Sequence, residues 1–228
     1  RVFFRSPAEE VCLAAEQHDL GFIEWEQSPS FNPQTGRPHS FMDLPTALHL
    51  ELWAKGIRQM LSFGRYPALL VSLHYASLRK HRAVYNSPEA APKEREFLDT
   101  QARLQAELLA SLKSDPHYAP FCSDEALERN RQLLAVWDWL SLLLCLGFAE
   151  ERRVPKVPAA GGTLDLALRP ENSSPARIRV APWPFRDREV KLTAEGRHLR
   201  QTSASESQMR DALRAAPLVP VIIHLIPR

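Results

Sequence analysis

The hydrophobic periodicity of this 228-residue sequence changes near Arg153, and that change constrains the fold more than any other feature. Before it, apolar residues recur every three to four positions, which is typical of helices packed against one another. After it, apolar and polar residues alternate, as in Thr163–Arg169 and Arg177–Val180, which is typical of half-buried strands. We therefore predict an α+β protein that is mainly α. A helical bundle would cover residues 1–153, and a small antiparallel β-sheet would cover residues 154–228.

Capping and helix-breaking residues give the boundaries of the predicted elements. The expected helices cover residues 7–19, 44–63, 66–85, 88 onward and 124–147, with a short one at 205–215. The expected strands cover residues 163–169, 177–180, 189–193 and 219–226. Residues 154–162, with two prolines and two glycines, are expected to join the two parts. The helix over residues 66–85 is apolar nearly all round and is predicted to be the central one.

Composition excludes several classes of protein. The net charge is only +2, which gives no global reason to expect binding to nucleic acid. The longest apolar run, Trp139–Phe148, is about half of the roughly 18 residues that a membrane helix needs. Arg1–Arg5 lacks the apolar core of a secretory signal. The three cysteines are far apart, which fits reduced thiols and no zinc finger or disulfide scaffold. We expect a cytoplasmic protein that binds neither nucleic acid nor membrane.

Two polar residues inside apolar helical segments are the strongest sign of a functional site. Asp138 lies within the apolar segment Val136–Cys145, and His74 directly follows the apolar segment Leu69–Leu73. A carboxylate in such surroundings needs a cation or hydrogen-bond donors. Metal ligation meets that need. The alternatives are an ion pair of Asp138 with Arg131, and a His74 that is simply a packed core residue.

The adjacent residues His18 and Asp19 end the first predicted helix. Together they offer a neutral nitrogen and an anionic oxygen, which can reach one metal ion or a metal pair. The alternative is a surface helix terminus, with Asp19 solvated and His18 stabilised by the helix dipole.

The order His18–Asp19, His49, His74 and Asp138 resembles that of the HD superfamily of helical metal enzymes. Their ligands run His, His-Asp, His, His and Asp along successive helices of a bundle. The resemblance implies a bundle like the HD domain, with these five residues as metal ligands and catalytic residues. It also implies hydrolysis of phosphomonoesters or phosphodiesters in most members, and oxidation of a substrate by dioxygen in di-iron members.

One position departs from the superfamily pattern. No histidine occurs among residues 1–17, where the first ligand of the superfamily is expected. Either that ligand lies outside this sequence, or the site is reduced. Nitrogen and carboxylate ligands without thiolate suit iron, manganese, cobalt or zinc. The resemblance therefore implies one or two such ions.

A closer resemblance covers nearly the whole chain. The segments His18–Trp25, Thr35–Pro38 and Leu70–His74 are similar to a bacterial family known as the domain of unknown function numbered 3891. Trp137–Leu142 and Pro182–Phe185 fit the same family. This resemblance supports the architecture and implies no established activity.

The segment after the His-Asp pair carries the candidate substrate-binding residues. Arg37 has a planar guanidinium group that suits a phosphate or a carboxylate. Glu24 and His39 lie in the same predicted loop. The alternative is that Gly36–Pro38 forms an ordered turn without a substrate role.

The favoured hypothesis is an HD-type metal-dependent phosphohydrolase that acts on a small molecule, such as a phosphoester. A di-iron oxygenase of the same superfamily is one alternative. A degenerate, non-enzymatic HD-like module that binds a ligand or a protein is another, and an open sheet edge would allow a homodimer. The sequence has no GxGxxG, GxxxxGK[ST], HExxH or GxSxG motif, so the corresponding enzyme classes are not supported.

Overall fold

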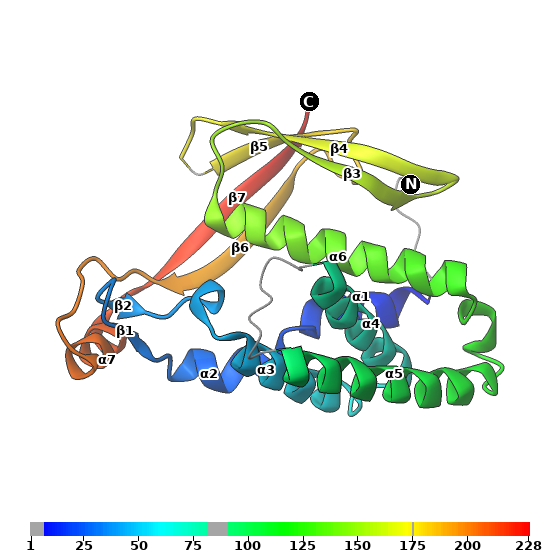
Figure 1. The fold of residues 1–228 in the computed structure, drawn as a ribbon. Helices are drawn as coiled ribbons and strands as arrows, with labels where there is room; N and C mark the ends of the chain where they lie inside the picture. Colours follow the sequence, from blue (N-terminus) through cyan, green and yellow to red (C-terminus); the bar gives the residue numbers. More distant parts are fainter. Residues whose placement is uncertain (1–6, 82–90, 175) are drawn as a thin grey trace. The chain divides into compact units, whose positions relative to one another are not determined.

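The computed structural model describes residues 7–81, 91–174 and 176–228 (Figure 1). These residues form two compact units. Among the described residues, the helical unit comprises Pro7–Gln27 together with Asp43–Trp139. The sheet unit comprises Ser28–Met42 and Leu140–Arg228. The fold is therefore α+β, as predicted, while the division at residue 153 stays a prediction.

The helical unit is built from α-helices and short 3-10 helices. They are α1 (Ala8–Gln17), η1 (Leu20–Phe22), α2 (Ile23–Gln27), α3 (Thr46–Met60), α4 (Arg65–His81), α5 (Ala91–Lys113), η4 (Ala119–Phe121) and α6 (Asp124–Leu146), which continues beyond the unit. The predicted helix start at residue 88 and the predicted end at residue 85 lie outside the described residues.

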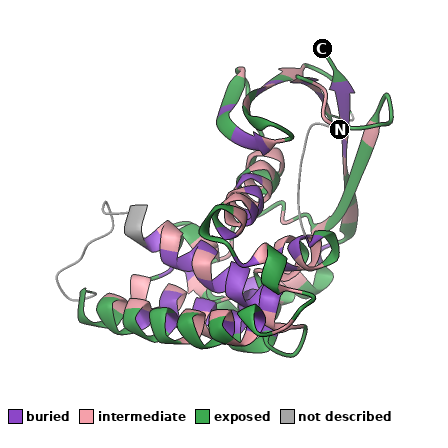
Figure 2. Cartoon of the chain, turned by 90° about the vertical axis from the view of Figure 1, so that its right-hand side faces the viewer, coloured by how far each residue is buried: buried purple, intermediate pink, exposed green. Residues whose placement is uncertain are grey.

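Helix α4 is the centre of the helical unit, as its sequence predicts. It packs against α1, α3 and α5. The fully buried side chains of its first half include Tyr66, Leu69, Leu70 and Val71. Figure 2 shows the buried residues gathered on the inward faces of these helices, with exposed residues on their outer faces. The predominantly apolar surface of α4 is thus covered on several sides, which is how a helix without a polar face is stabilised.

Two glycines let the turn after α1 approach α3 closely. A Cβ atom on Gly21 would lie only 2.0 Å from the carbonyl oxygen of Leu52. A Cβ atom on Gly56 would lie 3.0 Å from the backbone nitrogen of Gly21 and 3.5 Å from the carbonyl oxygen of His18. The backbone contact between η1 and α3 therefore depends on the missing side chains, and it fixes the position of the residues just before Gly21.

The sheet unit contains a five-stranded sheet in the order β3-β4-β5-β7-β6. Its elements are β3 (Arg152–Ala159), β4 (Gly162–Glu171), β5 (Ala176–Ala181), β6 (Val190–Arg197), α7 (Glu206–Ala215) and β7 (Leu218–Pro227). The buried face carries alternate residues of neighbouring strands, such as Leu166 and Leu168 of β4 and Ile178 and Val180 of β5. This is the period of two that the sequence predicts.

The observed sheet differs from the predicted small, mainly antiparallel sheet in its size and in one parallel pairing. The segment expected as a joint, residues 154–162, contains most of β3, so the sheet is larger than predicted. In addition, β7 pairs in parallel with β5 and antiparallel with β6. Prolines 155 and 158 are tolerated in β3 because an edge strand does not need every backbone N–H group for pairing.

A short hairpin of β1 (Phe31–Asn32) and β2 (Arg37–Pro38) also belongs to the sheet unit, and the 3-10 helix η2 (Phe41–Asp43) follows it. Gly36, with a φ of 66°, contacts the segment before α7. There the backbone N–H of Ser203 donates to the carbonyl oxygen of Gly36 at 2.7 Å. This contact places Arg37 and His39 in the sheet unit. Among the described residues, no helix is both long and apolar enough to cross a bilayer.

Candidate metal centre

His18 is held at the C-terminal end of α1 by its own helix. Its Nδ1 atom lies 2.8 Å from the carbonyl oxygen of Ala15, which accepts the hydrogen bond. A ring that donates from Nδ1 has its Nε2 lone pair available in the neutral state. A metal-binding histidine is commonly oriented by such a contact to a backbone carbonyl group. Nε2 of His18 is therefore the atom that can act as a ligand.

His74 is the most deeply buried titratable residue of the centre. Its side chain is 0% exposed, on the central helix α4. Its Nε2 atom lies 3.3 Å from Oδ2 of Asp138. Among the described residues, neither ring nitrogen has a partner in hydrogen-bond geometry. A buried polar ring without such a partner is costly in an apolar interior, and a cation near Nε2 would compensate for it.

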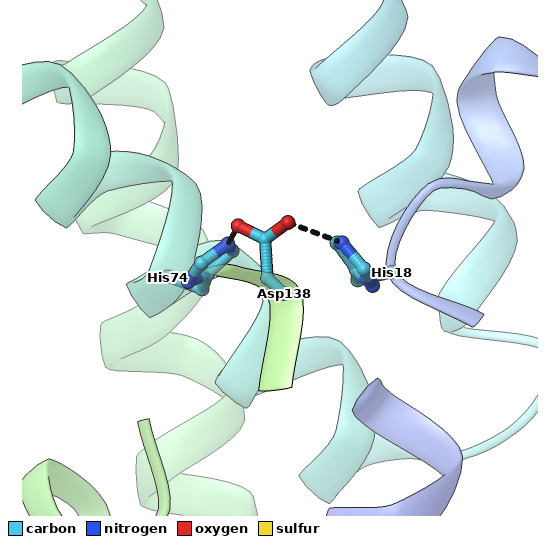
Figure 3. Close-up of side chains that lie close together, drawn as sticks. All are labelled: His18, His74 and Asp138. Carbon is cyan, nitrogen blue, oxygen red and sulfur yellow. Dashed lines mark ion pairs between the residues drawn. The ribbon is translucent and has the colours of Figure 1, made fainter. Parts of the chain in front are cut away.

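Asp138 of α6 stands between the two histidines (Figure 3). One carboxylate oxygen faces His74, and the other lies 3.5 Å from Nε2 of His18. Arg131, the alternative partner that the sequence offers, pairs with Glu128 at 2.7 Å instead. The carboxylate is thus placed by three different helices between two imidazole rings.

The charges of the centre are strongly coupled. Burial lowers the pKa of His18, but the interactions with Asp138 and Asp19 and the hydrogen bond to Ala15 outweigh it and raise the pKa to about 9. Burial lowers the pKa of His74 despite the nearby carboxylate. Burial alone would raise the pKa of Asp138, but the two histidines hold it well below its usual value. Without a metal, a proton on His18 therefore balances the buried carboxylate.

Asp19 lies at the solvent side of the same histidine. Its Oδ2 atom is 3.3 Å from Nε2 of His18, and its side chain is 59% exposed. The hydroxyl group of Tyr75 donates to the other carboxylate oxygen, Oδ1, at 2.7 Å. It also lies 2.9 Å from the carbonyl oxygen of His18. Tyr75 was not predicted from the sequence. Its adjacency to His74 is the only signal there, and adjacent helical residues point in different directions.

The remaining predicted residues make contacts of their own. His49 of α3 packs against the rings of Phe22 and Trp53, at centroid distances of 5.8 and 5.4 Å. It is not one of the residues that converge on Asp138. Glu24 of α2 forms an ion pair of 2.5 Å with Lys55. Arg37 and His39 belong to the sheet unit, where Nδ1 of His39 lies 3.0 Å from the hydroxyl oxygen of Ser30.

The converging residues fit a metal ion. His18, His74 and Asp138 each offer one ligand atom, and these atoms lie within 4.8 Å of one another. Ligands at about 2.0–2.2 Å from one ion lie roughly 3–4 Å apart, which is close to the observed spacing. Two imidazole nitrogens and one carboxylate oxygen form a donor set that suits zinc, iron, manganese or cobalt. The group can therefore hold a metal ion.

Comparison with known proteins gives a family and no activity. Neither the curated proteins nor the solved structures include a significant match to this chain. A family model described as "Protein of unknown function (DUF3891)" matches residues 2–201. That match covers the described helices up to α6 and strands β1 to β6. The chain therefore belongs to the DUF3891 family of proteins of unknown function.

Proposed function

We propose that this protein is a metal-dependent hydrolase in which His18, His74 and Asp138 bind one catalytic metal ion. The observation that carries the proposal is the convergence of these three side chains from α1, α4 and α6, with His74 fully buried beside Asp138. A metal ion explains why two imidazoles and a carboxylate share an apolar interior. Asp19 is the proposed fourth ligand, because its carboxylate faces the same nitrogen of His18.

The proposed site is of the HD type in the order and origin of its ligands. The His-Asp pair ends one helix, and the later His and the closing Asp come from two others. His49 lies among aromatic rings instead of beside Asp138. The proposal is therefore a single-ion site without His49. Phosphomonoesters or phosphodiesters are the proposed substrates, because HD-type sites most often hydrolyse them.

The buried and the exposed residues of the site would have different roles. A divalent metal ion supplies Lewis acidity and lowers the pKa of a bound water to about 7. His74 and Asp138, exposed by 0% and 17%, anchor the ion from the interior. Asp19 stands on the exposed side, from which a water molecule can reach the ion. Substrate would therefore approach from the Asp19 side.

The first experiment is elemental analysis of the full chain, purified without a chelator or a histidine tag. We expect about one equivalent of iron, manganese, cobalt or zinc, and its loss in the double variant H74A/D138A. The matched control is H224A/E189A, which removes a His–carboxylate pair of 2.5 Å from the sheet unit. The control should keep the metal.

Activity is tested next with the metal-loaded protein. We expect hydrolysis of a generic phosphomonoester or phosphodiester by the wild type and by H224A/E189A, and none by H74A/D138A. A protein that takes up no metal on reconstitution would refute the proposal and favour a non-enzymatic binding module. A loaded protein that hydrolyses no phosphoester but consumes oxygen with a substrate would favour the oxygenase alternative.

A further inference from the structure

Tyr75 connects the rigid core of the helical unit to the exposed edge of the candidate metal centre. It follows His74 on α4 and is 2% exposed, although its hydroxyl group reaches an exposed carboxylate. The hydroxyl group donates to Oδ1 of Asp19 at 2.7 Å and lies 2.9 Å from the carbonyl oxygen of His18. Both residues of the His-Asp pair are therefore in contact with one phenol group.

The phenol ring itself has little freedom to move. It stacks on the indole of Trp53, with a centroid distance of 4.7 Å and an angle of 17° between the planes. Trp53 is also buried. An offset stack between two buried rings fixes the position of the hydroxyl group at the end of the phenol. The hydroxyl group is thus a donor whose place is set by α3 and α4 before any ligand binds.

The side chain of Asp19, by contrast, is not restrained by burial. With 59% of its side chain exposed, a free carboxylate would rotate and be solvated. The hydrogen bond from Tyr75 occupies Oδ1 and leaves Oδ2 facing Nε2 of His18 at 3.3 Å. One oxygen is therefore used for orientation, and the other is directed toward the position of the ion.

We infer that Tyr75 is a positioning residue that holds Asp19 as the fourth, one-oxygen ligand of the metal ion. The inference rests on the proposed function, because it requires that His18, His74 and Asp138 bind a metal. It adds a reason why the proposed ligand on the solvent side is in place. Contacts of this kind, which orient a ligand without touching the metal, typically change metal affinity by about 10–100-fold when they are removed.

The test compares two buried tyrosines of the same unit. Y75F removes the hydroxyl group from Asp19 and keeps the ring that stacks on Trp53. Y66F is the matched control, because the Tyr66 hydroxyl also makes two hydrogen bonds, with Phe121 and Asn130, outside the metal centre. Thermal unfolding of each variant measures the structural cost. Competition titration with Co²⁺ and Zn²⁺ measures the affinity, and the visible absorption of bound Co²⁺ reports its ligands.

We expect Y75F to bind Co²⁺ and Zn²⁺ about 10–100-fold more weakly than the wild type. We expect its Co²⁺ spectrum to match that of D19A. Y66F should keep the wild-type affinity and spectrum, whatever its thermal stability. In the D19A background, Y75F should weaken binding no further, because the carboxylate that it orients is gone.

The two ways of failing are distinguishable. Wild-type affinity and spectrum in Y75F would overturn the role of Tyr75 and leave the metal site intact. A wild-type protein that binds neither Co²⁺ nor Zn²⁺ would overturn the proposed function together with this inference. Should Y75F not fold, D19N replaces it: the amide keeps an oxygen for Tyr75 but loses the anionic ligand, so weaker binding and an altered spectrum are expected. Unchanged binding in D19N would overturn the inference.

Discussion

Nδ1 of His18 donates a hydrogen bond of 2.8 Å to the carbonyl oxygen of Ala15, one turn earlier in α1. This contact directs Nε2 toward Asp138 and Asp19, and the same nitrogen has to serve a proton or a metal ion. A metal ion and a proton therefore compete for this nitrogen.

Metal affinity should rise with pH. The pKa of His18 is raised to about 9 without metal, so below that pH a metal ion has to displace a proton. The apparent affinity for Zn²⁺ should then increase about tenfold per pH unit between pH 6.5 and 9 and level off above it. The pKa of His74 is lowered and that of Asp138 lies well below its usual value, so neither adds a proton in this range. Competition titrations across that range check this, and an affinity independent of pH would contradict it.

Metal binding should stabilise the fold. An ion bound only by the native state at a free concentration of 100 times its Kd adds about 2.7 kcal/mol to the free energy of unfolding. For a chain of this size, that corresponds to a rise in Tm of about 5–10 °C. Differential scanning fluorimetry with Zn²⁺ and with chelator measures the difference. H74A/D138A should show no shift, and an equal shift in that variant would place the stabilising ion elsewhere.

His49 should be dispensable for metal binding. The HD-like order predicts it as a ligand, but its ring packs between Phe22 and Trp53. H49A should therefore lower the Tm through lost packing and keep the metal content of the wild type. Elemental analysis of H49A and H74A in parallel tests whether His49 is needed for metal binding. Loss of the metal in both variants would restore His49 as a ligand.

The contact between η1 and α3 should be sensitive to a single methyl group. G21A places a Cβ atom 2.0 Å from the carbonyl oxygen of Leu52, so backbone has to move. We expect a loss of about 3 kcal/mol in the free energy of unfolding and weaker metal binding, because His18 and Asp19 lie just before this contact. G196A is the control, since its Cβ atom would meet nothing within 4 Å. Denaturant unfolding measures both variants, and equal stability would show that the contact is loose.

The sequence predicts the kind of site better than it predicts which residues form it. His74 and Asp138 are identifiable because polar groups in apolar helical segments need partners. Their convergence is not identifiable, because periodicity gives the buried face of each helix but not which faces meet. His49 shows the limit: a half-buried histidine suits an aromatic cluster as well as a metal. Tyr75 shows the opposite case: a tyrosine in an apolar helix is expected to be a core residue, so the sequence does not identify it as part of the site.

The strand order of the sheet likewise could not be predicted from the sequence. Alternation predicts β4 to β6, and a more continuous apolar run predicts β7. Neither pattern gives the strand order, because the side chains along a strand do not identify the strand that it pairs with. Prolines 155 and 158 suggest a joint and instead lie in β3, where an edge strand tolerates them. The predicted helices are closer to the observed ones because the first two-thirds of the chain has a sustained period of 3.6 residues.

The position of β7 has a consequence for how the family's domain should be delimited. The family match ends at residue 201, before α7 and β7. Yet β7 lies between β5 and β6: it pairs with β6 over Leu218–Leu225 and with β5 over Ile223–Pro227. A protein shortened to the matched segment would lose an interior strand and expose the backbone edges of β5 and β6, which invites aggregation. The cooperative folding unit of the sheet therefore extends to Pro227, some way beyond the segment by which the family is recognised.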